Sequence, residues 1–229
     1  MPDERAPQQE RSLARRAAIL ESAASIFDRV GYGTASLSQI ATEAGLGQGL
    51  LYFYFRTKEA MALAVIQEQN ERTFAVMGQH ADPDSPFSTL VRASRGIGEL
   101  LLSDAVVRAG IRLSLEQGVF AEPTSEFYDQ WIQGVVNAFA AARDVGEITN
   151  SITPERLGAN VVAYFTGVQL VSNVRTGRTD LMDSLNTMWS VLVDALVTPE
   201  NRDRLRAVVT DTFEGSARHE VPVASDAVT

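Results

Sequence analysis

The sequence has no cysteine and only two histidines, His80 and His219. The missing thiols exclude a disulfide framework, thiolate zinc sites, iron–sulfur clusters and a cysteine nucleophile. His80 stands beside a proline-containing loop with Asp82 near it, which favours a solvated surface pair over a catalytic one. We therefore expect no cofactor, no metal and no catalytic residue, and an all-α enzyme is kept only as the last alternative.

Long apolar runs are also missing. The most apolar stretch, residues 159–174, is interrupted by Asn160, Gln169 and Asn173. It falls short of the about 20 apolar residues that a membrane-spanning helix needs. The first residues are polar and carry both signs, unlike a secretory signal. These absences predict a soluble protein of the cytoplasm with no membrane partner.

Basic residues are few, and the 229-residue chain has a net charge of −9, which argues against a nucleic-acid partner. The charge is unevenly spread, however. Residues 1–60 hold seven basic and seven acidic groups, so residues 61–229 carry the whole net charge. Between residues 11 and 58 six basic groups face three acidic ones, a net of +3, and Lys58 is the only lysine. The charge pattern predicts a mildly basic head and an acidic body.

Strand-like alternation is nearly absent, and apolar residues recur with helical spacing. We expect an all-α fold of about nine to ten helices, with a three-helix head at residues 1–56, a helical body at 57–211 and a disordered tail at 212–229. The first eight or so residues are expected to be flexible. The expected helices cover about 9–30, 36–44, 48–54, 57–79, 87–102, 104–117, 124–143, 154–175, 179–197 and 199–210.

The head has the start and stop signals of a helix-turn-helix. One apolar stripe ends at Gly31 and Gly33. Ser36 and Gln39 fit a capping box, and residues 45–47 form a glycine-containing turn between two short helices. The stripe of the first helix consists of Leu13, Ala17, Leu20, Ala24 and Phe27.

The second short helix would present its first residues to base edges in the major groove. Gln48 matches the edge of adenine, and Gly49 lets the backbone approach the DNA closely. Tyrosine hydroxyls, the Lys58 ammonium and the helix start at Ser36 suit phosphates. The alternative is a pair of core helices with half-buried tyrosines. The candidate DNA-binding residues are Thr34, Ser36, Gln48, Gly49, Tyr52, Tyr54 and Lys58.

The run from Ala23 to Glu59, with Gly31-Tyr32, Ser36-Leu37-Ser38-Gln39-Ile40-Ala41 and Ala44-Gly45-Leu46-Gly47-Gln48-Gly49-Leu50-Leu51-Tyr52-Phe53-Tyr54-Phe55, closely resembles the DNA-binding head of TetR-family repressors. That resemblance implies a dimeric DNA-binding protein. Tyr54 is within the family pattern. Many relatives have lysine where Gln48 stands, which leaves the base preference open.

The body is similar to the γ-butyrolactone receptors of antibiotic-producing actinomycetes. The similarity covers residues 11–197 and rests on residues 107–113, Trp131, Met188-Trp189 and, in the head, residues 28–32. It implies a pocket for a small lactone, with Trp131 as a wall and Gln69 and Thr166 as polar contacts. The alternatives are that Trp131 packs in the core and that Gln69 is solvated.

The last two long helices are apolar on more than one face, so a partner subunit related by two-fold symmetry is expected to cover one of them. Family resemblance implies the same homodimer through a four-helix bundle. Gly158 and Gly167 would allow close approach of helices. The candidate interface residues are Leu157, Val161, Phe165, Leu185, Trp189 and Leu192, of which Trp189 is core or interface rather than ligand site.

These expectations describe a ligand-responsive transcriptional repressor. A dimer would bind two half-sites about one DNA turn apart on a pseudo-palindromic operator. A diffusible γ-butyrolactone, butenolide or furan would release it and so control antibiotic genes. The alternative is a pseudo-receptor of the same fold that responds to antibiotics or other metabolites.

Overall fold

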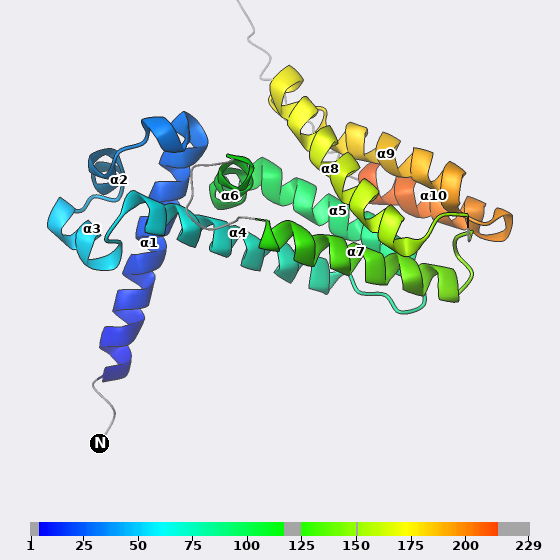
Figure 1. Ribbon diagram of the computed structural model, residues 1–229, viewed down its shortest axis with the longest axis horizontal. Coiled ribbons are helices and arrows are strands. Elements are labelled where there is room, and N and C mark those ends of the chain that lie inside the picture. Colours follow the sequence, from blue (N-terminus) through cyan, green and yellow to red (C-terminus); the bar gives the residue numbers. More distant parts are fainter. Residues whose placement is uncertain (1–4, 117–124, 150, 215–229) are drawn as a thin grey trace, which may run out of the picture. The chain divides into compact units, whose positions relative to one another are not determined.

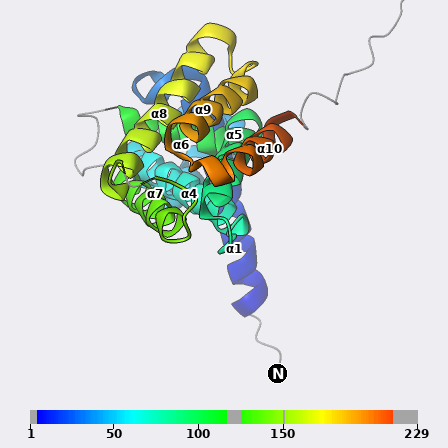
Figure 2. The same ribbon diagram turned by 90° about the vertical axis from the view of Figure 1, so that its right-hand side faces the viewer.

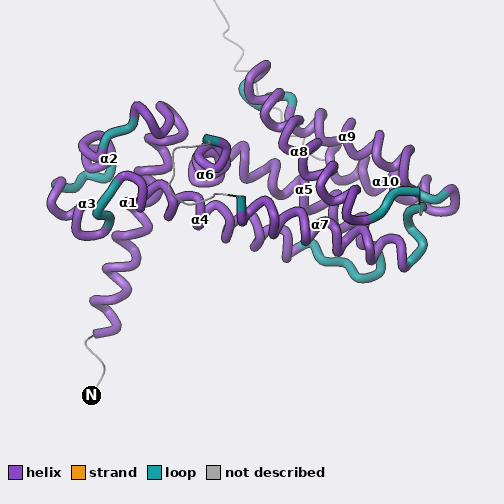
Figure 3. The backbone as a smooth tube through the Cα atoms, viewed as in Figure 1, coloured by secondary structure: helices purple, strands orange, loops and turns teal. Residues whose placement is uncertain are grey.

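The computed structural model describes residues 5–116, 125–149 and 151–214, with side chains from residue 9 onward. Within these ranges every regular element is an α-helix (Figure 3), and strand-like pairing is limited to one isolated bridge between Ile148 and Val197. The all-α prediction is therefore confirmed. Two predicted segments lie outside the described residues: the side chains of the flexible start, and residues 215–229 of the tail, which include His219.

The helices of the described residues follow one another along the chain (Figure 1). They are α1 Arg5–Thr34, α2 Leu37–Glu43, α3 Gln48–Tyr54, α4 Lys58–Gln79, α5 Pro86–Ser103, α6 Ala105–Leu115, α7 Glu126–Asp144, α8 Pro154–Thr176, α9 Leu181–Leu196 and α10 Pro199–Glu214.

Most helix ends lie within a few residues of the predicted ones, because caps and glycines determine them locally. Two ends differ. The backbone leaves helical geometry at Gly31, with φ 77, but a further turn of α1 continues to Thr34. α10 runs one turn past the expected end near residue 210, so residues 212–214 belong to a helix and not to a tail. No helix in the described ranges is both long and apolar enough to span a membrane.

The chain forms two compact units, one of residues 1–79 and 99–130 and the other of residues 80–98 and 131–229. The first unit contains the whole predicted head together with α4 and α6. The second contains α8, α9, α10 and most of α5 and α7. The predicted domain boundary after residue 56 stays a prediction.

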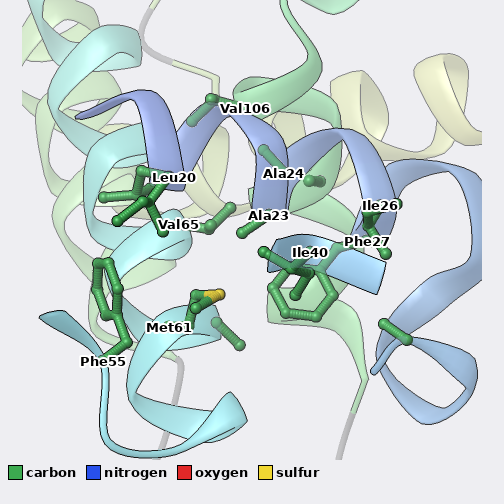
Figure 4. Close-up of a cluster of buried hydrophobic side chains, with 14 of the residues drawn as sticks. Leu20, Ala23, Ala24, Ile26, Phe27, Ile40, Phe55, Met61, Val65 and Val106 are labelled. Carbon is green, nitrogen blue, oxygen red and sulfur yellow. The ribbon is translucent and has the colours of Figure 1, made fainter. Parts of the chain in front are cut away.

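The core of the first unit lies where α1, α2 and α3 meet α4 and α6 (Figure 4). Phe27, Leu51 and Met61 have no exposed surface there. Full burial of side chains of this size stabilises the fold by about 1.5–3 kcal/mol each. The predicted stripe of α1 is correct from Leu20 onward. Leu13 is 61% exposed, so the stripe does not begin where the spacing suggested.

The second unit has a core of aromatic rings from three helices. Phe87 of α5 packs edge-on against Trp189 of α9 with ring centroids 5.5 Å apart, and Phe139 of α7 lies 6.4 Å from Phe87. The indole N–H of Trp189 donates a 2.6 Å hydrogen bond to the Ser94 hydroxyl. In both views α9 runs beside α8 and α10 (Figures 1 and 2).

Candidate nucleic-acid interface

α2 and α3 form a helix-turn-helix whose geometry is fixed by local contacts. The Ser36 hydroxyl accepts a hydrogen bond from the Gln39 backbone N–H at 3.2 Å, and the Ser36 N–H donates to the Gln39 side chain at 2.9 Å. This is the predicted capping box. The turn that follows α2 contains Gly45 at φ 66, a conformation that glycine adopts without the cost a side chain would add.

α3 is anchored on one side and exposed on the other. Leu51 is fully buried in the core of the first unit. Gln48 and Gly49, at the start of the helix, are exposed, and Tyr52 is 49% exposed. The outer side therefore offers an amide, a bare stretch of backbone and a phenol hydroxyl, which are groups that can read base edges and bind phosphates.

The only lysine connects the start of α4 to the end of α1 and the residues before α2. The Lys58 ammonium donates hydrogen bonds to the carbonyls of Tyr32 at 2.8 Å and Ala35 at 3.0 Å, and it lies 4.3 Å from the centre of the Tyr32 ring. Burial, followed by the carboxylates of Glu59 and Glu116, raises the pKa of Tyr32, so the ring stays neutral. The predicted phosphate contact of Lys58 stays a prediction.

The other predicted DNA-binding residues surround the same helices. Thr34 is exposed at the end of α1, and Ser36 is exposed although its hydroxyl takes part in the capping box. Tyr54 is half-buried at the end of α3, and its hydroxyl lies 3.3 Å from the Ser12 hydroxyl of α1. The predicted contacts thus all belong to a single compact unit, and their role in binding DNA stays a prediction.

α6 is tied to the end of α1 by two arginines. Arg108 forms a 2.7 Å ion pair with the Asp28 carboxylate, and Arg112 donates to the Asp28 carbonyl at 2.7 Å. Gly31 lies so close to Arg112 that a Cβ there would come within 2.7 Å of the guanidinium. The two sequence segments that carried the receptor resemblance, residues 28–32 and 107–113, therefore contact each other.

Residues 19–65 match the tetR family of bacterial regulatory proteins, and residues 84–198 match the C-terminal domain of tetracyclin repressor-like proteins. The A-factor receptor protein of Streptomyces griseus is 34% identical over 191 residues, which cover 83% of this chain and 67% of that protein. The chain belongs to the TetR family.

Solved TetR-family structures agree with this assignment. A γ-butyrolactone receptor superposes with a TM-score of 0.75 over 90% of this chain and 98% of its own, at 24% identity, which shows the fold. The CprB protein of Streptomyces coelicolor, solved in complex with its biological operator sequence, gives a TM-score of 0.75 at 26% identity over 90% of this chain and 99% of that one. This TetR protein is thus a ligand-responsive transcriptional repressor close to the γ-butyrolactone receptors, and not an enzyme.

Gln69 is buried inside the first unit and is not solvated. Its side-chain N–H donates to the Thr73 hydroxyl at 3.0 Å. Gly110 of α6 packs closely against it, because a Cβ added to Gly110 would lie 2.3 Å from the Cβ of Gln69. The Gln69 carbonyl oxygen has no hydrogen-bond partner within the described ranges. One acceptor is therefore left for a ligand, and the predicted contact stays a prediction.

In the second unit Trp131 is 6% exposed and packs edge-on against Phe165 at 5.5 Å, while Thr166 is half-buried. One turn after Phe165 lies Gln169, which is 1% exposed. Neither polar atom of its amide has a partner in the part of the chain that the structure describes. Sequence reasoning placed Gln169 only as a polar interruption of an apolar helix, because nothing in the spacing reveals an unpartnered amide.

The structure buries most of the predicted interface residues within their own subunit, and their role in a subunit contact stays a prediction. Five of the six predicted interface residues are at most 6% exposed in the single subunit, and the sixth, Leu192, is half-buried. Side chains that their own subunit already covers have little surface left for a partner. The five core residues are Leu157, Val161, Phe165, Leu185 and Trp189.

Gly158 also serves the subunit's own packing. A Cβ on it would come within 2.4 Å of Val136 on α7, so it permits close approach of α7 and α8. Gly167 has open space around it. The Asp82 carboxylate, expected to lie near His80 at the surface, lies 3.5 Å from Arg92. The described residues contain no cluster of metal-ligating side chains.

Proposed function

We infer that this TetR protein binds a pseudo-palindromic operator as a homodimer and is released by a small diffusible signal. The observation that carries the proposal is α3, which is anchored by Leu51 and presents Gln48, Gly49 and Tyr52 outward. Two such helices in a two-fold dimer suit half-sites about 34–36 Å apart, one turn of DNA. Similarity to the A-factor receptor supports a γ-butyrolactone, butenolide or furan as the signal and antibiotic genes as the target.

A dimer surface is available on the outer face of the last two long helices. Exposed apolar side chains are found on both helices, and Val174 in the last turn of α8 is 84% exposed. We call this the α8–α9 face; it consists of Tyr164, Leu170, Val171 and Val174 of α8 and Val191 of α9. Its burial by a second copy would remove apolar surface from water and hold two heads together.

Effector binding is supported by unpartnered amide groups in an apolar setting. A small amphiphilic ligand needs apolar walls and a few convergent polar groups. Trp131 supplies an apolar wall, and Gln169 supplies a donor and an acceptor from the same unit. In the first unit Gln69 supplies an acceptor.

The contacts of α6 give a route by which effector binding would reach the head. Arg108 and Arg112 hold the last turns of α1, so a shift of α6 moves the end of α1 and the helix-turn-helix that follows it. If the effector favours a shifted state, effector and operator must weaken each other's binding by the same factor.

The test is an operator titration. A duplex that the protein selects from a random-sequence library is bound first, and a synthetic γ-butyrolactone is then added while fluorescence anisotropy is followed. Release at saturating lactone is expected. A complex that persists at saturating occupancy, measured by calorimetry, contradicts release. Calorimetry that finds binding of antibiotics but not of lactones supports the pseudo-receptor instead.

A variant separates the effector site from the DNA site. Gln169→Leu is expected to keep operator affinity and to lose lactone affinity by about tenfold or more, since one lost hydrogen-bonding group costs about 1.4 kcal/mol or more in binding. Val145→Leu, at an exposed position outside both sites, is the matched control. Unchanged lactone affinity in Gln169→Leu contradicts the assignment of Gln169.

A further inference from the structure

The first turns of α1 form a helix that the rest of its unit does not cover. Every side chain from residue 9 to residue 18 is exposed, and Ile19 is the first buried one. Figure 1 shows these turns running beyond the other helices of the first unit. Helices are ordinarily stabilised by burying one face. A helical segment with no buried face is therefore suited to a partner that covers it.

A groove lies between these turns and α3. It has a volume of about 690 Å³ and is wholly within the first unit. The Ser12 and Tyr54 hydroxyls, 3.3 Å apart, connect its two walls. Its lining is Gln9, Arg11, Ser12 and Arg15 from α1 and Leu50, Phe53 and Tyr54 from α3.

The two arginines of the groove differ from Arg16 and Arg29 of the head. Arg11 and Arg15 form no ion pair within the described ranges, whereas Arg29 lies 3.6 Å from Glu43 and the Arg16 guanidinium lies 5.2 Å from the centre of the Phe55 ring. Arg11 and Arg15 are one helical turn apart and so lie on the same side of α1. Two unpaired guanidinium groups at this spacing suit an extended chain of anionic groups.

The groove also has an apolar part. Phe53 is 77% exposed, the largest exposure of any aromatic side chain reported for the described residues, and Leu50 beside it is half-buried. A single inorganic anion would need the arginines and hydroxyls but not these apolar groups. A nucleic-acid strand has both phosphates and the apolar faces of sugars, so it fits the whole lining.

We propose that this groove binds the sugar–phosphate backbone of the operator strand next to the major groove that α3 enters. The proposal rests on the proposed function, because α3 supplies one wall of the groove and the recognition residues on the same helix. Arg11 and Arg15 contact phosphates, the Ser12 and Tyr54 hydroxyls hydrogen-bond to the same backbone, and Phe53 covers a sugar. The first turns of α1 thereby add affinity without reading sequence.

The test compares two double variants of the full-length protein that lose the same charge. Arg11→Gln/Arg15→Gln changes the groove. Arg92→Gln/Arg206→Gln changes two half-exposed arginines of the second unit, which pair at the surface with Asp82 and Asp194. Anisotropy is measured between about 50 and 200 mM salt on the selected operator duplex and on a duplex of random sequence, and circular dichroism checks that both variants are folded.

Each phosphate contact contributes about 0.9 to the slope of log affinity against log salt. A dimer of the groove variant loses four arginines, so its slope is expected to flatten by about 3–4 relative to the native protein and to the second-unit control. The ratio of operator to random-duplex affinity is expected to stay the same, since phosphate contacts carry no sequence information.

Two results would overturn the proposal. One is a groove variant with the salt slope of the control. The other is a groove variant that loses its preference for the operator, since the arginines would then act on α3 and not on the DNA backbone. A native protein that selects no sequence at all contradicts the proposed function, which separates that failure from a failure of the groove.

Discussion

Two buried polar side chains in the second unit show how differently single residues contribute to stability. The Ser94 hydroxyl accepts the Trp189 indole N–H, whereas the amide of Gln169 has no partner in the described ranges. Removing one partner of a buried hydrogen bond costs about 1–3 kcal/mol, while replacing an unpartnered polar group with an apolar one of similar size is close to neutral or stabilising. The two side chains therefore predict opposite results.

Ser94→Ala is expected to lower the free energy of unfolding by about 1–3 kcal/mol, because the indole N–H loses its acceptor. Gln169→Leu is expected to leave it unchanged or to raise it by about 1 kcal/mol. Urea denaturation followed by circular dichroism measures both. A larger loss in Gln169→Leu than in Ser94→Ala would mean that the Gln169 amide is satisfied in solution and is not held ready for a ligand.

At the scale of helices, the contact of α7 with α8 depends on a missing side chain. A Cβ on Gly158 would meet Val136 at 2.4 Å and backbone atoms of Ile132 and Val136 at 3.1 Å. Gly158→Ala is expected to lower the free energy of unfolding by about 1–3 kcal/mol through overpacking. Thermal denaturation checks the value.

Gly134, on an exposed position of the same α7, is the matched control. A Cβ there meets nothing within 4 Å. Gly134→Ala is expected to raise the free energy of unfolding by up to about 1 kcal/mol, the difference in helix propensity between alanine and glycine. If both alanines stabilise the protein, α7 and α8 do not approach as closely as the structure shows.

Three helices of the first unit meet at one guanidinium. Arg72 of α4 bonds to Glu21 of α1 at 2.5 Å, to Glu68 at 3.0 Å and to Asp104, the N-cap of α6, at 2.8 Å. Burial alone would lower the pKa of Arg72, but the hydrogen bonds to these carboxylates outweigh it and hold the pKa above its ordinary value. The guanidinium stays charged at any usable pH.

Arg72→Met is expected to lower the free energy of unfolding by about 1–3 kcal/mol, since three carboxylates lose their common donor and Asp104 is only 17% exposed. Arg206→Met is the control, because its ion pair with Asp194 is exposed on both sides and is worth about 0–1 kcal/mol. Chemical denaturation at low and high salt compares the two. Equal losses would show that the Arg72 contacts are only surface pairs.

At the scale of the whole molecule, the order of the helices and most of their ends could be predicted because caps, glycines and the 3.6-residue period are local signals. The subunit interface could not. α8 is apolar on two sides, and the sequence does not show that Leu157, Val161 and Phe165 face its own core while Val171 and Val174 face outward. That choice depends on which helices pack together, and it is the reason that the proposed interface differs from the one expected from the sequence.

The basic groove escaped prediction for the same reason. The sequence predicted that the first helix would be packed along its length, and Leu13 began the expected stripe. In the structure Leu13 is 61% exposed and the arginines beside it line a groove with α3. The net charge of +3 over residues 11–58 could be read from the sequence, but the place where the charge meets an apolar side chain required the fold.

If the dimer forms through the α8–α9 face as proposed, its formation decides whether the molecule can hold an operator. Val171 lies within this face and is 54% exposed. Val171→Asp would bury two unpaired carboxylates, one from each copy, in the proposed interface, and unpaired charges are costly to bury. We expect a folded monomer, with sedimentation velocity giving about 25 kDa in place of about 50 kDa, in line with the chain mass of 24.9 kDa.

The Val171→Asp monomer should also bind the operator more weakly. A monomer binds one half-site and loses the effective concentration that a linked second head provides, which raises affinity by a factor of about 10²–10⁴. Val145→Asp is the control, since Val145 is 52% exposed but lies outside the α8–α9 face. It is expected to stay dimeric and to bind the operator as the native protein does. A Val171→Asp protein that sediments as a dimer would place the subunit contact elsewhere on the molecule, and one that is monomeric yet binds the operator with native affinity would show that two heads are not needed.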